Sequence, residues 1–554
     1  VQSACQDGSP SSASLVMRLE RLYANRGVQA GVYMGSLTFF ILLVLLPPLS
    51  GILLKTSRLT EIYAQPSLMA RAQSAIAWSF AIAFLVSTLD LLAGIPLAWF
   101  IVRSKTRWVN VIDTLADIPF IIPTAALGFS TLLFWSTPGG AAALLGVDSL
   151  ISPGVVLILL LHFAFSFPAV VRVMVGALLG YEATYEVAAK TLGAQPFTAA
   201  RTVTLPILRP AVVASFLLAF ARSLSETGAT VMVAGAFENG PVFIKNAKDA
   251  GLEGPLVFVS FILIFASVLA FGLISLVGPR LKIPVRRASP RAERALSGRT
   301  GVAFRDIVTM LVFFIFVITP SLFIALPAGS ALTDGTLQKA LSGSGPWGPY
   351  WQSVLLSYTI GVIATLVNIA AGLPVAVILA RRRAGKVPTA LLDALVNIPI
   401  VVPSIALGVS LSFFWNTFGG LPEFWVLVLS HTTITYTYFV RSMSAAIEGI
   451  SPEMEETARS LGARPLTVFR KITVPLSKYA ALSGAILVFT RSVDETGAAI
   501  AVSRELKTAP VLLVEWVKGT VPVSASERAL GVGLLALTSF IALLVLRLVT
   551  RRRR

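Results

Sequence analysis

The stretch IPFIIPTAALG at residues 118–128 returns as IPIVVPSIALG at residues 398–408, 280 positions further along the chain. Asp113 and Asp393 precede the two stretches at the same spacing. Beyond the loop that follows, the offset between matching residues falls from 280 to 269, so the second copy is shorter there. A match of this length that continues after one gap indicates an internal repeat.

Histidine supplies an independent sign of the same repeat. The chain contains two histidines, His162 and His431, and they stand 269 positions apart. Arg172 and Arg441 each follow ten residues after a histidine. Because such rare residues pair at one offset, the sequence predicts two tandem copies of one unit.

The composition indicates that lipid surrounds most of the chain. Of 554 residues, 55% are hydrophobic and 13% charged, and the mean hydropathy is +0.81, whereas a soluble domain has roughly 25% charged residues. The apolar residues form runs of about 20, which is the length of a membrane-spanning helix and not of the alternating strands of a barrel. Since a helix satisfies its own backbone hydrogen bonds in lipid, we predict an all-α integral membrane protein.

Twelve apolar segments can be drawn along the chain, six in each copy. They cover residues 31–54, 74–102, 108–135, 153–176, 208–234, 256–278, 303–326, 351–380, 389–415, 424–446, 478–502 and 527–549. Because six is an even number, both copies start from the same side of the membrane. We therefore expect about twelve transmembrane helices, arranged as two parallel six-helix repeats related by a pseudo-twofold axis along the membrane normal.

The basic residues set the expected orientation. A basic run at 381–386 follows the eighth segment, whereas the loops 137–152 and 416–423 contain no lysine or arginine. By the positive-inside rule those two loops lie outside, and both termini lie in the cytoplasm. This topology leaves four cations outside, namely Lys55, Arg58, Lys245 and Lys248. Because the net charge of +18 resides between apolar segments, we expect no nucleic-acid partner.

These features divide the chain into five parts. We expect a cytoplasmic N-terminal tail at residues 1–30, a first repeat at 31–279, a basic cytoplasmic linker at 280–302, a second repeat at 303–550 and a basic C-terminal tail at 551–554. We expect the linker to be a solvated loop that faces lipid headgroups, rather than a dedicated regulatory site.

A short polar motif follows the fourth apolar segment of each copy. It reads EVAAKTLGA at residues 186–194 and EETARSLGA at residues 455–463. This pattern predicts a short helix that carries an acid in its first turn and is ended by Gly193 or Gly462. We call residues 186–206 the first elbow and residues 455–475 the second elbow. Each elbow is expected to form a rigid cytoplasmic knob that transmits force.

The elbow motif resembles the EAA loop of binding-protein-dependent ABC importer permeases, and the resemblance extends over residues 74–278 and 351–549. In that family the loop forms a coupling helix that docks into a groove on the ATPase subunit. The resemblance assigns this coupling role to Glu186, Ala188, Ala189, Gly193, Pro206, Glu455, Thr457, Ala458, Gly462 and Pro475. Thr457 departs from the family pattern, in which alanine is usual at that position.

The same resemblance implies partners. The glycine-rich phosphate loop of an ATPase is absent from the sequence, since the one Gly-Lys pair, Gly385-Lys386, is followed by Val387. The resemblance therefore implies that ATP and Mg²⁺ bind to a separate ABC ATPase, present in two copies, and that an extracytoplasmic solute-binding protein delivers the cargo. It also implies a multi-pass protein of the prokaryotic cytoplasmic (inner) membrane. We expect no catalytic residue, cofactor or metal site in the chain itself.

The cargo stays open at this point. The fused two-copy layout resembles ferric-iron and thiamine permeases, whereas the Glu-Thr-Gly-Ala runs resemble the Glu-Phe-Gly-Ala run of sulfate and molybdate permeases. An inorganic ion such as ferric iron or an oxyanion, or a small organic cation such as thiamine, is therefore expected. The alternatives are an ion-coupled secondary transporter with parallel six-helix halves and a membrane scaffold that transports nothing.

Charged residues interrupt the fifth and eleventh segments, which read RSLSETGA at 222–229 and RSVDETGA at 491–498. A charge at the bilayer centre costs about 2.5–3.5 kcal/mol, so these side chains should face the interior and be paired. The spacing of four predicts that Arg222 neutralises Glu226 and that Arg491 neutralises Glu495. Two interpretations remain for these residues and Asp494: ion pairs that fix the interface between halves, or a lining of the translocation path.

Two further groups are candidates for the path. His162 and His431 could titrate near neutral pH or bind a metal, or they could pack against neighbouring helices, and Arg172 and Arg441 accompany them. Prolines at Pro119, Pro123, Pro399 and Pro403 remove backbone hydrogen bonds and should kink the third and ninth segments. A hypothesis is that these kinks open a cavity for the cargo.

Overall fold

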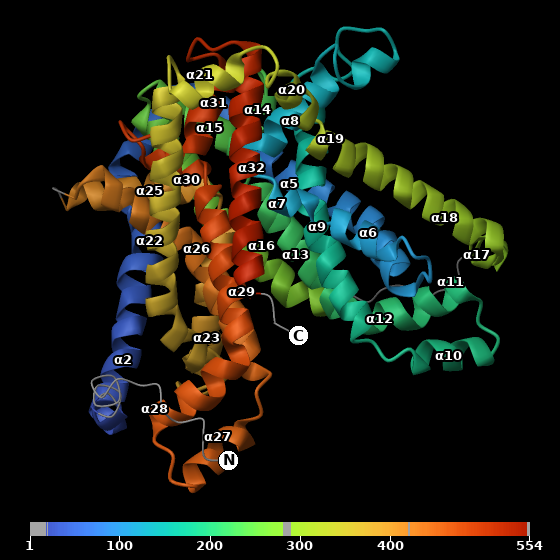
Figure 1. Cartoon of the computed structure of the whole chain (residues 1–554), viewed down its shortest axis with the longest axis vertical. Coiled ribbons are helices and arrows are strands. Elements are labelled where there is room, and N and C mark those ends of the chain that lie inside the picture. The colour runs from blue at the N-terminus through green and yellow to red at the C-terminus, as the bar shows by residue number, and fades with distance from the viewer. Residues whose placement is uncertain (1–17, 19, 281–289, 419–420, 551–554) are drawn as a thin grey trace.

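In a computed structural model of the chain, all elements of the described part are helices (Figure 1). The structure describes residues 18, 20–280, 290–418 and 421–550. Most of the predicted N-terminal tail, part of the predicted linker (281–289) and the C-terminal tail (551–554) lie outside the described residues. The sequence-based expectation of an all-α protein is confirmed.

The first half runs from α2 to α16. Its larger helices are α2 (Arg26–Phe39), α5 (Pro66–Arg103), α6 (Val109–Leu115), α8 (Thr124–Ser136), α9 (Val155–Leu179), α10 (Thr184–Thr191), α13 (Arg209–Ser225), α15 (Gly240–Asp249) and α16 (Glu253–Val277). Short helical pieces join them: η1 (Phe40–Leu45), α3 (Leu46–Ser50), η2 (Leu53–Leu59), α4 (Thr60–Tyr63), α7 (Ile118–Ile121), η3 (Ala141–Leu144), α11 (Pro196–Ala199), η4 (Ala200–Thr204), α12 (Leu205–Ile207), α14 (Gly228–Val233) and η5 (Gly278–Arg280).

The second half repeats this order after α17 (Pro290–Ser297). Its larger helices are α18 (Arg299–Val312), α22 (Trp347–Ala380), α23 (Lys386–Val396), α25 (Ser404–Thr417), α26 (Glu423–Glu448), α27 (Pro452–Ser460), α29 (Val474–Val493), α31 (Ala509–Lys518) and α32 (Ala525–Thr550). The shorter ones are η6 (Phe313–Ile318), α19 (Thr319–Leu322), α20 (Ala325–Ser330), α21 (Thr336–Ser342), α24 (Ile398–Val401), α28 (Pro465–Val468), η7 (Phe469–Thr473) and α30 (Gly497–Val502).

The number of membrane spans agrees with the prediction. Eight helices of the described part are long and apolar enough to cross a bilayer, and three bent helix pairs raise this number to eleven. The remaining predicted span corresponds to α26, which has 26 residues. At about 1.5 Å per residue, this helix is also long enough to cross a bilayer. Helix α26 is less apolar than its counterpart α9 because it carries a run of buried threonines.

The third and ninth segments are broken at sharp kinks. The chain bends by 105° between the helical pieces before and after Pro123, and by 103° between those on either side of Pro403. The residue before each proline, Ile122 or Val402, has an extended backbone, as steric contact with a proline ring requires. The predicted kinks are thus present at Pro123 and Pro403, and they are sharp enough to divide each segment into separate helices.

The fifth and eleventh segments are also discontinuous. Helix α13 ends at Ser225, and the chain resumes as α14 at Gly228. In the second half α29 ends at Val493 and α30 begins at Gly497. The continuous helices expected over 208–234 and 478–502 are therefore wrong, and the charged residues of both segments lie at the breaks.

The first helix of each half packs against the other half. Helix α2 contacts α22, and α18 contacts α5. One serine in each half fixes the exchanged segment: the Ser410 hydroxyl accepts a hydrogen bond from the Ile52 backbone N–H (2.7 Å), and Ser130 accepts one from Ile324 (2.8 Å). In Figure 1 α2 accordingly lies beside the second-half helices, and α18 lies on the opposite flank.

The described part of the predicted linker is a helix instead of a solvated loop. Helix α17 contacts α11 of the first elbow. Glu293 of α17 is buried and bonds to Thr198 and Arg201 at 2.7 and 2.6 Å, and Ser297 accepts the Phe197 backbone N–H. A basic composition alone did not reveal this contact because it depends on the one acid of α17, Glu293.

The two elbow helices, α10 and α27, lie at the same end of the molecule, whereas α15, α21 and α31 lie at the other end (Figure 1). The four cations that the predicted topology leaves outside all have acceptors. Arg58 pairs with Glu61 at 2.6 Å, and Lys245 pairs with Asp249 at 2.5 Å. Lys55 lies 4.0 Å from Glu253, and Lys248 donates to backbone carbonyls of the other half.

Candidate functional site

A cavity of about 910 Å³ lies between the two halves. Its wall is formed by α7, α13 and the start of α8 from the first half and by α26 and α29 from the second half. Five charged residues line it: Asp117, Arg222, Arg441, Arg491 and Asp494. A volume in this range is typical of a site that encloses a small ligand.

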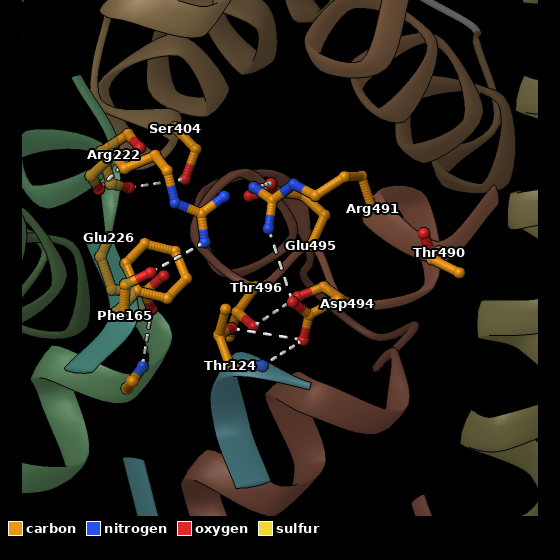
Figure 2. Close-up of polar contacts among 12 residues, drawn as sticks. Thr124, Phe165, Arg222, Glu226, Ser404, Thr490, Arg491, Asp494, Glu495 and Thr496 are labelled. Carbon is orange, nitrogen blue, oxygen red and sulfur yellow. Dashed lines mark hydrogen bonds and ion pairs between the residues drawn. The ribbon is translucent and has the colours of Figure 1, made fainter. Parts of the chain in front are cut away.

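Arg222 lies in this cavity between two aromatic rings. Its guanidinium carbon is 4.0 Å from the ring centre of Phe165 and 4.5 Å from that of Phe120. Nη2 donates a hydrogen bond to the Phe165 carbonyl at 3.2 Å (Figure 2). The buried Nε has no hydrogen-bond partner among the described residues. Cation–π contacts stabilise the charge and leave donors for a ligand.

The predicted pair between Arg222 and Glu226 does not form. The guanidinium of Arg222 is held by Phe120 and Phe165 instead of facing Glu226. The carboxylate of Glu226 accepts the Ala229 backbone N–H at 2.9 Å and so caps α14. No carboxylate of the described residues forms an ion pair with Arg222, whose nearest polar contact is the Phe165 carbonyl.

Arg491 forms the pair that the sequence predicted, and a second one. Its guanidinium lies 3.8 Å from Glu495 and 3.5 Å from Asp494. Asp494 also accepts the Thr124 backbone N–H at 2.5 Å, a contact between the halves at the N-terminus of α8 (Figure 2). Glu495 caps α30 through the Ala498 N–H at 3.1 Å. The negative charges around Arg491 are thus held at helix N-termini, where the dipole stabilises them.

The two halves differ at one decisive position. Ser225 in the first half corresponds to Asp494 in the second, at the offset of 269. As a result, Arg491 has a neighbouring carboxylate in the cavity wall and Arg222 has a serine. Asp117, the lining acid of the first half, pairs with Arg172, so the positive charge of Arg222 is not balanced by an ion pair among the described residues.

Glycines bring the two breaks into direct contact. A Cβ atom added at Gly228 would lie 2.6 Å from Cβ of Thr496 in the other half, and one added at Gly497 would lie 2.9 Å from the Thr227 hydroxyl. Real Cβ atoms do not approach other atoms that closely. The glycine of each Glu-Thr-Gly-Ala run is thus required by the interface between halves.

The histidines are placed away from the cavity wall. His162 is buried and forms hydrogen bonds to Ser223 and Thr230, each at 2.8 Å, and His431 bonds to Ser492 at 3.0 Å. Each histidine therefore links the fourth or tenth span to the broken span beside it. These contacts favour the packing interpretation over a metal or proton site.

Arg172 and Arg441 hold the broken third and ninth segments. Arg172 lies 2.5 Å from Asp117 and 2.6 Å from Asp113, and Arg441 lies 2.5 Å from Asp393. These pairs tie α9 to α6 and α26 to α23. Among the sequence-predicted path residues, the structure thus brings Arg222, Arg491, Asp494 and Arg441 to the cavity, and it places Glu226, Glu495, the histidines and Arg172 behind its wall.

The elbows have the predicted local structure. Each contains a short helix, α10 or α27, with Glu186 or Glu455 in its first turn. Gly193 and Gly462 follow with φ of 91° and 85°, a region that favours glycine. Ala188 and Thr457 are exposed, Ala189 and Ala458 are half-buried, and Pro206 and Pro475 stand at the starts of α12 and α29.

The elbow glutamates are buried rather than exposed to a partner. Glu186 is 6% exposed and pairs with Lys190 at 2.6 Å and with Arg103 at the end of α5. Glu455 is 8% exposed and pairs with Arg381 at the end of α22 at 2.8 Å. Each glutamate therefore fastens its elbow to the second span of its own half.

Each elbow exposes apolar side chains among its polar ones, which sequence reasoning missed. Leu192 is 89% exposed and Leu461 is 84% exposed, and Tyr185, Val187 and Met454 also face solvent. Grouped apolar side chains on an exposed knob mark a protein interface. The signal was present, since Leu192 matches Leu461 and Tyr185 matches Met454 at the offset of 269.

The protein is helical and has two parallel repeats with a charged cavity between them. Each repeat carries an elbow with a buried glutamate. This architecture is that of a membrane transport permease. The sequence model of one protein family, described as the binding-protein-dependent transport system inner membrane component, matches residues 90–283 and 372–553 of the chain. The chain therefore belongs to this family and carries its domain twice, as the fused permease of a type I ABC importer.

Individual relatives match less than half of this chain. The sulfate transport system permease protein CysT of Salmonella typhimurium is 32% identical over 208 residues, which is 36% of this chain and 74% of the relative. The probable sulfate permease cysT of Nephroselmis olivacea is 31% identical over 247 residues, or 43% of this chain and 87% of the relative. The molybdenum transport system permease protein ModB of Mycobacterium tuberculosis is 36% identical over 166 residues, or 30% and 63%.

Proposed function

We propose that the chain forms the whole transmembrane pathway of an ATP-driven importer whose cargo is a small oxyanion, such as sulfate or molybdate. Similarity to the sulfate and molybdenum permeases supports this cargo class. The observation that carries the proposal is the unpaired guanidinium of Arg222 in the cavity between halves. Ferric iron and thiamine are disfavoured because a cation would meet this unbalanced positive charge.

The binding chemistry follows from the arginine geometry. A guanidinium presents planar donors that match the oxygen atoms of an oxyanion. Arg222 supplies a free Nε–H, and Arg491 also has a buried Nε without a partner in the described part of the chain. Since Asp494 is occupied by the Thr124 N–H, an anion that enters beside Arg222 is not opposed by a carboxylate directed at it.

Coupling to ATP is assigned to the elbows. The two elbows, whose exposed apolar side chains include Leu192 and Leu461, are proposed to dock on two copies of an ABC ATPase, which would bind ATP and Mg²⁺. Glu186, Gly193 and Pro206 would shape the first elbow, and their counterparts Glu455, Gly462 and Pro475 the second. The buried glutamates would pass motion of the docked helix to α5 and α22, and so produce alternating access.

The remaining assignments follow from this scheme. A solute-binding protein would deliver the anion at the opposite end, near α15 and α31. The elbows and both termini would lie in the cytoplasm, and the protein would reside in the cytoplasmic membrane of a prokaryote. An ion-coupled secondary transporter is less well supported, because such a carrier has no need of two elbows with exposed apolar side chains on one side.

The proposal is tested by uptake into proteoliposomes that contain the permease, its ATPase and its binding protein. ATP-dependent uptake of sulfate or molybdate is expected. Arg222→Met should raise the cargo concentration for half-maximal uptake by about tenfold or more, as loss of one charge-assisted contact implies. Arg222→Lys should retain part of the activity. Uptake of ferric iron or thiamine without oxyanion uptake, or uptake without the ATPase, would overturn the proposal.

A further inference from the structure

A second cavity of about 690 Å³ lies beside the second elbow and shares no lining residue with the central cavity. It is enclosed by α2, the end of α22 and the segment α28–η7 of the elbow. Four arginines and one acid line it: Arg26, Arg381, Arg383, Arg459 and Glu455. Even after Glu455 offsets one arginine, the lining keeps a net positive charge.

The backbone holds two of these arginines in place. Arg382, with φ of 48°, is the only non-glycine residue of the described part with a positive φ. This turn directs Arg381 toward Glu455 and Arg383 toward Tyr33 of α2, where Arg383 donates to the tyrosine hydroxyl at 2.5 Å and lies 5.0 Å from the ring centre. Left-handed backbone is unfavourable for an arginine and often marks a functional site.

The rest of the lining is apolar. Ile369, Leu373 and Val377 of the membrane-spanning helix α22 form one wall, and Leu466 and Phe469 of the elbow form another. A free inorganic anion needs no apolar wall. The cavity has basic residues at the end of a membrane span and apolar side chains along the span. This arrangement fits a phospholipid, whose charged headgroup is followed by apolar acyl chains.

From this arrangement we propose that the cavity binds an anionic phospholipid, with its phosphate at Arg26 and Arg383 and an acyl chain along α22. The bound lipid would neutralise the excess charge and hold α2 against the second elbow. It would thereby position Glu455, because Arg381 lines the cavity and also donates a hydrogen bond to Glu455. The effect on coupling rests on the proposed function of the elbow, whereas the binding itself does not.

The first half offers a matched control. Lys105 stands 278 positions before Arg383, as Arg103 stands before Arg381. Like Arg383, Lys105 follows the second span of its half and carries one positive charge, and it is not among the residues that line the second cavity. Lys105→Gln therefore removes the same charge at the corresponding place without touching the proposed site.

The test is native mass spectrometry of the full-length permease, taken from vesicles of phosphatidylcholine with phosphatidylglycerol as the anionic probe. The wild type and Lys105→Gln should retain phosphatidylglycerol selectively. The double variant Arg26→Gln/Arg383→Gln should lose retention on the order of tenfold, because each cation near a phosphate contributes to binding. Leu373→Trp should fill the apolar wall and also lower retention, with no change in charge.

The outcomes separate the possible occupants. Equal retention by all four proteins would overturn the proposal. Displacement of phosphatidylglycerol by millimolar inorganic phosphate, with no effect of Leu373→Trp, would identify a free-anion site and also overturn it. Since neither ATPase nor cargo is present, a failure of oxyanion transport leaves the lipid result intact. Cargo-stimulated ATP hydrolysis in vesicles with and without phosphatidylglycerol then measures the coupling effect.

Discussion

The carboxylate of Glu186 lies 3.1 Å from the guanidinium of Arg103, which joins the first elbow to the last turn of α5. Glu455 and Arg381 repeat the contact at 2.8 Å between the second elbow and α22. A buried carboxylate that loses its partner is costly, so each pair constrains the elbow strongly. The duplicated geometry indicates that elbow and span move as one body.

This relationship predicts the effect of Glu186→Gln combined with Glu455→Gln. The amides keep the shape and remove the charge that holds Arg103 and Arg381. Cargo-stimulated ATP hydrolysis should fall by about tenfold, the factor that corresponds to ~1.4 kcal/mol of lost positioning. Glu456→Gln, an exposed change on the same helix as Glu455, is the control and should leave hydrolysis unchanged. Equal rates for all variants would contradict the positioning role.

The elbow glycines give a second prediction. Gly193 and Gly462 adopt positive φ, and no atom lies within 4 Å of a Cβ added at either, so valine would meet backbone strain of about 1–2 kcal/mol rather than a clash. Gly193→Val/Gly462→Val should displace the ends of α10 and α27, and the ATPase should no longer copurify. Gly180→Ala, at an ordinary φ of −80°, is the control. Undiminished copurification would argue against the elbow as a docking element.

The interface between halves gives a third prediction. Gly228→Ala places a Cβ against Thr496, and overpacking of this kind costs about 1–3 kcal/mol. The apparent unfolding temperature in detergent should fall, and a Thr496→Gly change in the same protein should restore it. Gly176→Ala, where no atom lies within 4 Å of the added Cβ, should leave the temperature unchanged or higher. No difference between the two alanine variants would contradict the close approach.

Lys248 gives a prediction that depends on pH. Its amine donates hydrogen bonds to the carbonyls of Ile500 and Ser503, and so links α15 to the end of α30 in the other half. Burial lowers the pKa of Lys248 from 10.5 to about 8. Because the unfolded state then binds more protons between these values, the folded state should gain stability as the pH rises from about 8 to about 10.

The measurement is the pH dependence of the unfolding temperature for the wild type and for Lys248→Met. The difference between the two curves isolates this lysine from other titrating groups. The wild type should gain stability relative to the variant over the interval from pH 8 to 10. Parallel curves would show that Lys248 does not titrate in the contact between halves.

Local features of the sequence predicted much of the structure. The apolar runs located the spans, and the elbow helices ended at Gly193 and Gly462 because a positive φ is a local property that glycine signals directly. The pair of Arg491 and Glu495 was also predictable from spacing. Beyond the first copy's third segment, the offset of 269 identified for each residue of the first half its counterpart in the second half, so an interpretation of one residue applied to both.

The failures arose where long-range contacts override local pattern. Helical spacing predicted a pair of Arg222 with Glu226, but Phe120 and Phe165, which come from other helices, hold the guanidinium of Arg222 away from that carboxylate. The exchange of the first helices depends on Ser130 and Ser410, whose hydroxyls meet segments far away in the chain. The sequence left open whether Arg222 is paired or lines the path, and the three-dimensional arrangement places it in the cavity wall without an ion pair among the described residues.

The most direct test of the central claim concerns the two elbows. Cys5 is the single cysteine of the chain, so Leu192→Cys and Leu461→Cys can each be introduced in a Cys5→Ser background and labelled with a membrane-impermeant maleimide. Both positions should react only from the cytoplasmic side of oriented vesicles, and the bound ATPase should protect both. Labelling from the outer side, from opposite sides, or without protection by the ATPase would contradict the account.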